Sequence, residues 1–583
     1  MLCFRAALVL LAVSFLAQTL RAEDASKPLG EPVLEPSTLN CLGVYWVVGG
    51  DANKNARIEI EYRKAGSEEW KPGYLLFRVE QSAQDPSKHE DGKGSKASVQ
   101  VPDGAWLFAG SVVNLTPGTD YELHLKLIDA DGGAAEKTLT TRTAVEPITP
   151  KDMHVRHVAP GSGGGSGSEQ DPYKGLAAAN AVAKPGDLFI VHAGTYDAFE
   201  TDKSGELGHP IIWRGEGAAV IDAKGKAPKA IAAGGIHDVW FEKLELCNAA
   251  YGIVTHDSER IVLRRCHIHG VEYGLAATRN TKGNMNGYFV TDNVIEGPSV
   301  WPRSKGIENA RGIQVTGSGH VVAYNRIHGF GDALDTFPSV KCAAIDFHNN
   351  DISLCTDDGI EMDYSERNTR CFNNRFVNIF QGVSVQPVFG GPVYIFRNVL
   401  CNLGMEPFKM HNSPSGVLVM HNTVIKNGMP LVLYPGKKVR NSVYRNNLFL
   451  GTEANYAYEC TGEMAGCDFD YDGFGGGPFK KVMKWSNTPY VTVDDLKAKS
   501  GVYKHIVMLD TPNIFASGFL PPADVAKEVD PSKLDLRLKP GTMAIDAGEA
   551  LANFSDGFSG KAPDLGAYEL GADAPFYGPR PEK

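Results

Sequence analysis

A chain of 583 residues is too long for one ordinary hydrophobic core, so at least two structural units are expected. Its hydrophobic content of 43% is that of a soluble protein, and its 64 glycines favour a fold with many turns. The formal net charge of −11 argues against nucleic acid or an anionic membrane surface as a partner. An acidic substrate would need a local basic patch.

Residues 1–22 are predicted to be an export signal. Arg5 supplies the positive start, Ala6 to Ala17 is apolar, and Leu20-Arg-Ala22 is a small-residue cleavage site before Glu23. No other stretch approaches 18 uninterrupted apolar residues, so membrane insertion is not expected. The protein is therefore predicted to be secreted or periplasmic.

Nine cysteines remain after the signal, and an odd number leaves at least one thiol outside any internal disulfide. No Cys-x-x-Cys occurs, so a structural zinc site is not expected. Cys460 and Cys467 share one loop and are a candidate disulfide after export. The cysteines in or beside predicted strands are expected to be small buried apolar residues; these are Cys247, Cys266, Cys342, Cys371 and Cys401.

Residues 35–145 predict a small β-sandwich, because several short alternating or apolar runs are separated by turns rich in Gly, Asp and Pro. The segment Leu115-Thr-Pro-Gly-Thr-Asp-Tyr121 resembles the fibronectin type III signature, in which a Tyr near a late strand anchors the loop before it. The resemblance implies that Trp46 is the core aromatic residue. Such domains are usually spacers or docking surfaces, so catalysis is not expected here.

Residues 146–170 are predicted to be a linker, with a flexible Gly161–Ser168 that lacks the Gly-Lys-Ser/Thr of a phosphate loop. Tyr173–Val182 has the apolar spacing of a helix. This helix, the strand Leu188–Val191 and Gly194-Thr-Tyr196 resemble the N-terminal cap of secreted right-handed parallel β-helix proteins. Such a cap covers a hydrophobic end and unpaired strand edges.

A motif of Asn, any residue and an apolar residue recurs at intervals of 25, 24, 24, 24 and 25 residues, which predicts stacked coils. The Asn side chains are expected to fill a left-handed turn position and to hydrogen-bond the coils above and below. The predicted fold class is all-β, with a right-handed parallel β-helix over residues 171–450 after the sandwich. The motif begins at Asn325, Asn350, Asn374, Asn398, Asn422 and Asn447.

Residues 451–583 are predicted to close the β-helix with a loop-rich segment. Leu534 to Leu538, Ala544 to Gly548 and Pro563 to Glu569 resemble the closing segments of bacterial secreted β-helix proteins. Asp468-Phe-Asp-Tyr-Asp-Gly473 imitates the start of an EF-hand, but its twelfth position is Phe479 where that loop needs Glu. A calcium site of another kind stays open there.

Alternate residues of a strand share one face, so the second strand of each coil sorts into two sets. The inward set is Ile360, Met362, Val383, Val385, Phe408 and Met410. The outward residues are expected in two columns, with coils about 4.8 Å apart. One column is Gln314, Asp335, Glu361, Ser384 and Lys409, and the other is Thr316, Asp363, Gln386, His411 and Tyr434. A solvated polar face is the alternative interpretation.

Crowded carboxylates perturb one another's pKa, as acid–base catalysis requires. Asp357 and Asp358 are expected at the turn before the strand and therefore to be structural. Trp301, Phe389 and Tyr434 are candidates for stacking against sugar rings. The predicted catalytic residues are Glu361, Asp363, Asp335, His411 and Lys409. The predicted substrate-binding residues are Gln314, Gln386, Tyr434 and Arg367.

Residues 150 to 570 resemble pectin-lyase-like β-helix proteins, and this resemblance implies a polysaccharide substrate. Glu361-Met-Asp363 resembles the calcium-and-catalysis coil of the alginate lyase and chondroitinase B type, although no Lys follows it at Ser365 to Asn368. The Asn-Thr-Asp and Gly-His-Gly of polygalacturonases are also missing.

The predicted function is therefore a secreted polysaccharide-degrading enzyme, most simply a glycoside hydrolase with a carboxylate pair. A lyase that performs β-elimination on a uronate is an alternative, with Lys409 or His411 as base and calcium held by Glu361 and Asp363. Hydrolysis requires no cofactor. A non-catalytic carbohydrate-binding or adhesion protein is the third alternative. The expected partner is the polysaccharide alone, and a monomer is expected.

Overall fold

The computed structural model describes residues 24–80, 83, 97–306, 308–336, 342–511 and 513–582. The predicted export signal lies outside these ranges. The fold is all-β, and the helices in the described ranges are short: α2 (Leu176–Val182), α3 (Val493–Lys499) and a 3₁₀ turn at Pro531–Lys533. None of the helices described is long and apolar enough to cross a lipid bilayer. The chain divides into two compact units.

The first unit is a two-sheet β-sandwich. One sheet holds β1 (Lys27–Pro28), β2 (Val33–Leu34), β3 (Leu42–Gly49), β6 (Phe77–Arg78) and β7 (Ala105–Val112). The other holds β4 (Arg57–Lys64), β5 (Lys71–Pro72), β8 (Asp120–Ile128) and β9 (Ala135–Arg142). Alternate residues of β4 and β8 are buried, which places one face of this sheet in the core.

The packing inside this unit agrees with two of the predicted features. Trp46 is fully buried in the core. The Tyr121 hydroxyl accepts a hydrogen bond from Thr116 N–H at 3.0 Å, across the loop before β8. The sequence did not predict that Leu551–Asp556 belongs to this unit. Within that segment Asn553 Oδ1 accepts the Val113 N–H at 2.7 Å. The assignment to fibronectin type III stays a prediction.

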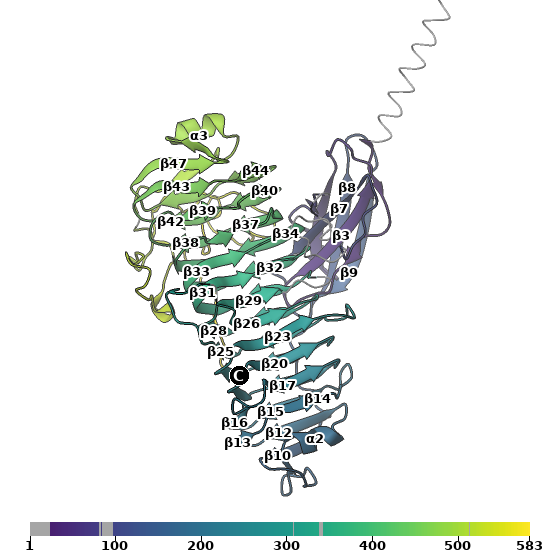
Figure 1. The fold of residues 1–583 in the computed structure, drawn as a ribbon. Coiled ribbons are helices and arrows are strands. Elements are labelled where there is room, and N and C mark those ends of the chain that lie inside the picture. The colour runs from purple at the N-terminus through teal and green to yellow at the C-terminus, as the bar shows by residue number, and fades with distance from the viewer. Residues whose placement is uncertain are drawn as a thin grey trace, which may run out of the picture. The chain divides into compact units, whose positions relative to one another are not determined.

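The second unit is a parallel β-helix of stacked coils (Figure 1). Its largest faces are three rows of parallel strands, here called the first, second and third ladders. The first ladder comprises β11 (Tyr173–Lys174), β10 (His154–Ala159), β12 (Asp187–Val191), β15 (Ile211–Gly215), β18 (Val239–Glu242), β21 (Val262–Arg264), β24 (Phe289–Thr291), β27 (Val321–Ala323), β30 (Asp346–His348), β32 (Thr369–Phe372), β34 (Phe389–Phe396), β37 (Ser415–Met420), β40 (Lys438–Arg440), β41 (Val443–Arg445), β44 (Glu463–Ala465) and β45 (Asp468–Asp470).

The second ladder comprises β13 (Gly194–Tyr196), β16 (Ala219–Asp222), β19 (Glu245–Cys247), β22 (His267–His269), β25 (Val294–Glu296), β28 (Arg326–His328), the first part of β31 (Asp351–Glu361), the first part of β33 (Arg375–Ser384), β35 (Val399–Leu403), β38 (Thr423–Ile425), β42 (Leu448–Leu450), β46 (Gly473–Gly475) and β49 (Val507–Met508). The third comprises β14 (Phe199–Thr201), β17 (Lys229–Gly234), β20 (Tyr251–His256), β23 (Tyr273–Arg279), β26 (Arg311–Val315), β29 (Asp332–Thr336), the later parts of β31 and β33, and β36 (Phe408–Lys409). β39 (Leu431–Leu433), β43 (Ala454–Cys460), β47 (Phe479–Trp485) and β48 (Thr488–Tyr490) form a further small sheet.

The β-helix extends beyond the predicted range of 171–450 at both ends. β10 already pairs in parallel with β12, so the first rung lies inside the predicted linker. The predicted flexible Gly161–Ser168 is a tight turn after that rung. A Cβ on Gly165 would lie 2.1 Å from the Pro172 carbonyl oxygen, so this turn needs glycine. At the other end, β42 pairs with β46 and β46 with β49, which extends the stack to Met508.

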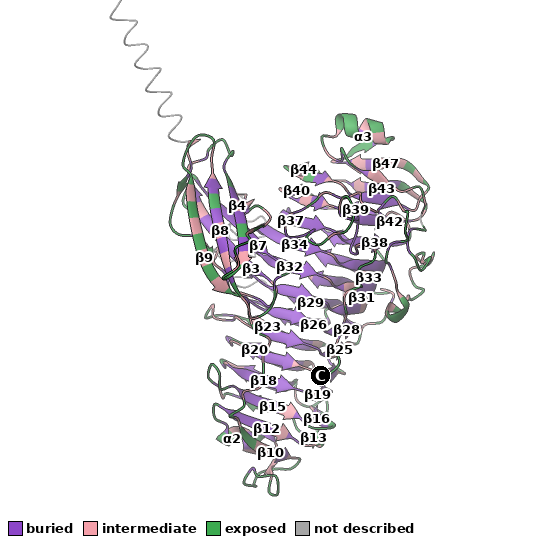
Figure 2. Ribbon diagram, turned by 180° about the vertical axis from the view of Figure 1, so that it is seen from behind, coloured by how far each residue is buried: buried purple, intermediate pink, exposed green. Residues whose placement is uncertain are grey.

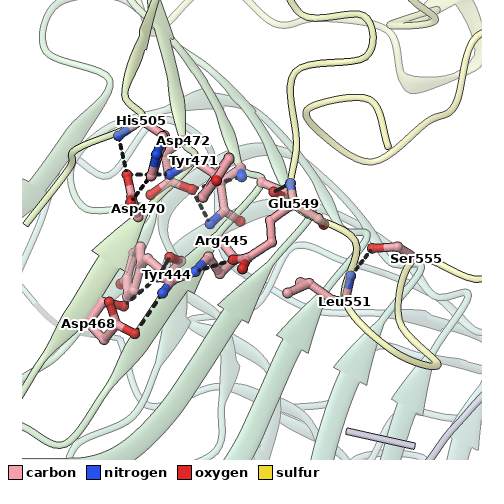
Figure 3. A network of polar contacts seen from close by, with 12 residues as sticks. Tyr444, Arg445, Asp468, Asp470, Tyr471, Asp472, His505, Glu549, Leu551 and Ser555 are labelled. Carbon is pink, nitrogen blue, oxygen red and sulfur yellow. Dashed lines mark hydrogen bonds and ion pairs between the residues drawn. The ribbon is translucent and has the colours of Figure 1, made fainter. Parts of the chain in front are cut away.

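Polar contacts cover this later part of the stack (Figure 3). Arg445 bonds Asp468 at 2.6 Å and Glu549 at 2.9 Å, and His505 Nδ1 lies 2.7 Å from Asp470 Oδ2. The acids of the calcium-loop-like segment are thus bound to protein groups. In agreement with the sequence, this segment is not an EF-hand, because Asp468 and Asp470 lie on strand β45.

The repeated Asn residues form one continuous buried column, as predicted. Each Asn amide donates to the side-chain oxygen of the next Asn, for example Asn350 Nδ2 to Asn374 Oδ1 at 2.9 Å, and to a main-chain carbonyl of the preceding coil. Asn293 begins the column and Asp472 ends it. The left-handed position is occupied by the residue before each Asn, such as Asn373 with φ 51°, and not by the Asn itself.

The interior of the second unit is a single apolar core in which the strands are largely buried (Figure 2). The five cysteines predicted as buried residues are buried, which confirms that prediction. The disulfide considered between Cys460 and Cys467 is not formed. Instead, Cys460 Sγ lies 3.2 Å from Met464 Sδ.

Residues 513–550 and 557–582, here called the C-terminal strap, pack along the outside of the coils. Its apolar residues form a second core with β33, β35, β38 and β42. Near the end of the chain, Arg580 Nε donates to Asp292 Oδ1 at 2.9 Å and its guanidinium lies 4.2 Å from the centre of the Tyr324 ring. The C-terminus therefore lies beside the early coils (Figure 1). The C-terminal strap therefore contacts both early and late coils.

Candidate active site

The strand register confirms the stacking predicted for one polar column on the third ladder. Gln314 pairs with Asp335, Asp335 with Glu361, Glu361 with Ser384 and Ser384 with Lys409. The predicted inward residues that alternate with them are fully buried in the core: Ile360, Met362, Val383, Val385, Phe408 and Met410. The outward residues of this Glu361 column therefore come together because each coil repeats one alternation of polar and apolar residues.

The second predicted column is only partly brought to the same place. Asp363 joins the Glu361 column, since its Oδ1 accepts Ser384 Oγ at 2.8 Å and Gln386 N–H at 2.6 Å. His411 Nε2 instead faces Glu406 Oε2 at 3.3 Å. Three residues lie apart: Thr316 is buried against Cys342, Arg367 bonds Glu366 at 2.8 Å, and Tyr434 follows β39 in the small sheet.

A further polar column, which the sequence analysis missed, runs beside the first. In register it is Arg311, Asp332, Asp358 and Gln381, here called the Asp358 column. The prediction that Asp357 and Asp358 occupy a turn before the strand is wrong, because both lie within β31. The Asp358 N–H donates to Asp332 Oδ1 at 2.8 Å, so the two coils are joined directly.

Lys409 Nζ faces both Asp358 and Glu361, so residues three apart on β31 share one face. A small residue follows the first polar residue on each strand, and a Cβ on Gly359 would lie 2.6 Å from a Phe376 ring carbon. A four-residue pattern of polar, small, apolar and polar residues therefore marks the site in the sequence. It reads Arg311-Gly-Ile-Gln, Asp332-Ala-Leu-Asp, Asp358-Gly-Ile-Glu and Gln381-Gly-Val-Ser.

Lys409 is the buried cation at the centre of the cluster. Its Nζ donates to Asp358 Oδ2 at 2.6 Å and lies 3.8 Å from Glu361 Oε1. Burial by itself lowers the pKa of Lys409, but the neighbouring carboxylates Asp358, Asp363 and Glu361 raise it by more. Lys409 therefore stays an ammonium ion and compensates negative charge.

Asp335 has the environment of an acid that holds its proton near neutral pH. Its Oδ2 accepts Gln314 Nε2 at 2.8 Å and lies 3.2 Å from Arg311 Nε, while its buried Oδ1 has no hydrogen-bond partner among the described residues. Burial, followed by the charge of Glu361, raises the pKa of Asp335 to about 7. Burial likewise raises the pKa of Asp363 well above its usual range.

Three carboxylates, two from the Asp358 column and one from the neighbouring Asp357, are close enough to hold a metal ion. Asp332, Asp357 and Asp358 each offer an oxygen, and these atoms lie within 4.8 Å of one another. All three residues are buried, and Asp358 Oδ1 has no hydrogen-bond partner within the described structure. Oxygen-only ligands suit Ca²⁺ or Mg²⁺. The sequence had instead singled out Glu361 and Asp363 for calcium.

The long loop between β25 and β26 contributes to the cluster. Arg303 Nη1 lies 3.3 Å from Asp357 Oδ1, and Glu308 Oε2 accepts Thr356 Oγ1 at 3.1 Å. Two of the proposed sugar-stacking residues are packed inside the protein. Trp301 is buried with its Nε1 donating to Val525 O at 3.2 Å, and Phe389 is buried.

A cleft of about 920 Å³ lies on the preceding coils, lined by the loops that connect the second and third ladders. Its last residues, Gly297 and Pro298, begin the loop that carries Arg303 and Glu308 to the carboxylates. In the same coils Tyr251 and Tyr273 stack at 4.7 Å between ring centres, and Tyr273 pairs in register with Arg311. The cleft and the carboxylate cluster therefore share one corner of the β-helix.

Solved structures with a similar fold are only distantly related in sequence. XylC in complex with xylose is 12% identical with a TM-score of 0.46, covering 72% of this chain and 98% of that chain. An alginate lyase from Paenibacillus sp. str. FPU-7 is 14% identical with a TM-score of 0.33, covering 53% and 95%. A family 28 exopolygalacturonase from Yersinia enterocolitica is 12% identical with a TM-score of 0.22, covering 80% and 100%.

These resemblances concern the fold alone. A comparison with curated proteins finds no match. Residues 230–399 match the family model of the right handed beta helix region, the architecture that the strand pairing gives for His154 to Met508.

Proposed function

We propose that this chain is a carbohydrate-active enzyme, and that it hydrolyses a glycosidic bond of a polysaccharide bound along the third ladder. One observation carries the proposal: Asp335 and Glu361 stand side by side on consecutive coils in very different surroundings. The Asp335 side chain is 4% exposed, whereas that of Glu361 is 18% exposed. Two carboxyl groups with unequal environments are the arrangement that divides acid and base roles.

The proposed roles follow from these surroundings. Asp335, protonated up to about pH 7, donates a proton to the leaving glycosidic oxygen. Glu361, with the Lys409 ammonium 3.8 Å away, acts as the base or nucleophile on the sugar. Asp363 is held by Ser384 and Gln386 and positions this coil. Hydrolysis by this route uses only side chains of the chain and water.

The cleft gives the substrate a place to bind before the cleavage point. It carries Lys224, Lys226, Asn248 and Glu272, which offer hydrogen bonds and charge to sugar hydroxyls. An extended chain lying from this cleft to Glu361 would cross the Arg303 loop. A polysaccharide substrate also agrees with the export predicted for residues 1–22.

A uronate lyase is the second candidate, and the three-carboxylate group at Asp332, Asp357 and Asp358 favours it. A Ca²⁺ ion held there would supply neutralisation of a uronate carboxylate. Against this candidate, Lys409 is held as an ammonium ion by Asp358 and so is not poised as the base. We therefore rank hydrolysis first.

A polysaccharide panel separates the candidates. The purified chain is incubated with neutral and uronate-containing glycans, with calcium or with a chelator, and both reducing ends and ultraviolet absorbance of unsaturated uronates are measured. Hydrolysis is expected to give reducing ends without the absorbance and without dependence on calcium. Both signals together, lost with the chelator, would assign the lyase. Neither signal across the panel would contradict catalysis and favour the binding protein.

The pH profile of the reaction tests the role of Asp335. Its pKa of about 7 predicts that kcat/KM falls about tenfold per pH unit above pH 7, because the acid loses its proton there. The initial rate is measured at low substrate concentration between pH 5 and pH 9, with constant ionic strength. A rate that instead rises steadily to pH 9 would point to a base that must lose its proton, and would contradict the assignment of Asp335 as acid.

A further inference from the structure

A second group of chemically reactive side chains lies on the second ladder, away from the carboxylate cluster. Leu246 and Ile268 point into the core, so Glu245 and Cys247 of β19 and His269 of β22 point outward. Cys247 pairs in register with His269. The parallel stacking of coils therefore places a thiol, an imidazole and a carboxylate on one small patch.

The ligand atoms of this patch are close enough to share one ion. One oxygen of Glu245, the sulfur of Cys247 and one ring nitrogen of His269 all lie within 4.8 Å of one another, and His269 Nε2 is 3.0 Å from Glu245 Oε1. The Glu245 and His269 side chains are about one-third exposed, at 34% and 32%, so an ion can reach them from solvent. Cys247 is buried beneath them.

The surrounding residues reinforce the negative character of the patch. Asp222 pairs in register with Cys247 on the preceding coil. Asn248 Nδ2 donates to Asp222 Oδ1 at 2.9 Å and approaches Cys247 Sγ at 3.6 Å, which fixes the side of the patch next to the cleft. On the following coil Glu296 Oε1 lies 3.3 Å from His267 Nε2. No Lys or Arg side chain forms an ion pair with Glu245 in the described part of the chain.

We propose that Glu245, Cys247 and His269 bind one divalent transition-metal ion of the zinc class. Sulfur, nitrogen and oxygen donors together are the set that Zn²⁺ favours, with a fourth position open to water. The set differs from the oxygen-only group at Asp332, which suits hard cations. Binding takes up the thiolate of Cys247 and releases its proton to solvent, and the ion replaces the His269–Glu245 hydrogen bond. The bound ion clips β19 to β22.

Cobalt binding provides a test that is specific for this site. The full chain, kept reduced with a phosphine, is titrated with Co²⁺ and the thiolate-to-cobalt charge-transfer absorbance is followed. One Co²⁺ per chain is expected to give this absorbance, Zn²⁺ to abolish it by displacement, and Zn²⁺ to raise the unfolding temperature. The oxygen-only group at Asp332 contains no thiol and contributes no such band.

Variants decide whether the named residues hold the ion. Cys247→Ser is expected to lose the band and His269→Ala to weaken Zn²⁺ binding at least about tenfold. Cys467→Ser, which alters the half-buried thiol of another coil, is the matched control. It is expected to keep both the cobalt charge-transfer band and the wild-type affinity for Zn²⁺. A wild-type chain without the band, or a band that survives Cys247→Ser, would overturn the proposal. Because no polysaccharide enters the assay, the result is independent of the proposed enzyme activity.

Discussion

Asp335→Asn and Glu361→Gln are each expected to lower kcat/KM on the cleaved polysaccharide by about a thousandfold or more. Loss of a positioned general acid or base costs on the order of 10² to 10⁴ in rate, and a lost nucleophile costs at least as much. Asn at position 335 can still accept the hydrogen bond of Gln314 but has no acidic proton to give. The initial rate of reducing-end formation measures the effect.

Folding should be almost unaffected by either change. Each substitution keeps the size of the side chain, and each replaces an acid in a cluster already crowded with negative charge. The unfolding temperature is expected to stay within about 3 °C of the wild type, which corresponds to about 1 kcal/mol for a large domain. A large loss of stability would show that the change acts through folding.

Asp120→Asn provides the matched control for these two variants. Asp120 also forms an ion pair, with Arg142 Nη1 at 2.6 Å, but its side chain is 54% exposed and belongs to the first unit. The substitution removes one carboxylate without touching the cluster, so full activity is expected. Wild-type turnover in both Asp335→Asn and Glu361→Gln would reject the acid–base assignment, while the fold and the metal proposal would stand.

The sequence contained enough information for the coils but not for their limits. A residue such as Asn374 recurs because every coil needs the same buried donor and acceptor at one corner, and this need produces a visible period. At the last coil of the column only an acceptor is needed, and Asp472 fills the position. The Asn motif therefore ends at Asn447, one coil before the column does. At the other end, β10 precedes a glycine turn and carries no repeated Asn.

One of the two polar columns of the candidate site could be predicted from the sequence, because its residues follow the regular alternation of a strand. Strict alternation correctly placed Asp335, Glu361 and Lys409 on one outward column. Asp358 was not predicted because two core-facing residues, Gly359 and Ile360, separate it from Glu361, so residues three apart share a face and the period of two no longer applies. Such a departure from alternation depends on contacts with neighbouring coils and is not visible in one strand read alone.

The zinc-class patch was missed because its ligands are joined only by stacking. Zinc sites are usually found in a sequence by closely spaced cysteines, and none are present here. Cys247 and His269 are 22 positions apart in the chain and adjacent in register. A parallel β-helix converts the coil length into a contact distance, so ligands of one site can come from successive coils.

Asn374→Ala is expected to lower the free energy of unfolding of the β-helix by about 3 to 5 kcal/mol. The Asn374 Oδ1 accepts both the N–H and the amide of Asn350, at 3.0 and 2.9 Å, and its own amide donates to the Phe347 carbonyl at 2.9 Å. All these groups are buried, and each one left without a partner costs about 1 to 3 kcal/mol. Urea unfolding followed by circular dichroism measures the loss.

Hydrogen exchange of the coil amides assigns this loss to the second unit, because the chain has two units and need not unfold in one step. Asn286→Ala is the comparison in a loop of the same unit, where the side chain is half-buried, donates to Asn284 O at 2.7 Å and also hydrogen-bonds Glu259. Its expected cost is below about 1 kcal/mol. Equal costs for the two variants would show that the buried column does not stabilise the coils.

The end of the column supplies a stricter comparison, because the Asp472 side chain accepts hydrogen bonds at a position where each Asn of the column also donates them. Its Oδ1 accepts the N–H and amide of Asn447, and its Oδ2 accepts the Tyr503 hydroxyl at 3.2 Å. Burial raises the pKa of Asp472 to about 7, so ionising this group in the core is unfavourable. Asp472→Asn keeps the acceptor and removes the charge, and is expected to be neutral or stabilising at pH 8. Asn374→Asp, by contrast, leaves the Phe347 carbonyl without its donor and should destabilise the chain. The same pair of residue types, exchanged in opposite directions, thus has opposite effects according to whether the side chain at that position must also donate hydrogen bonds.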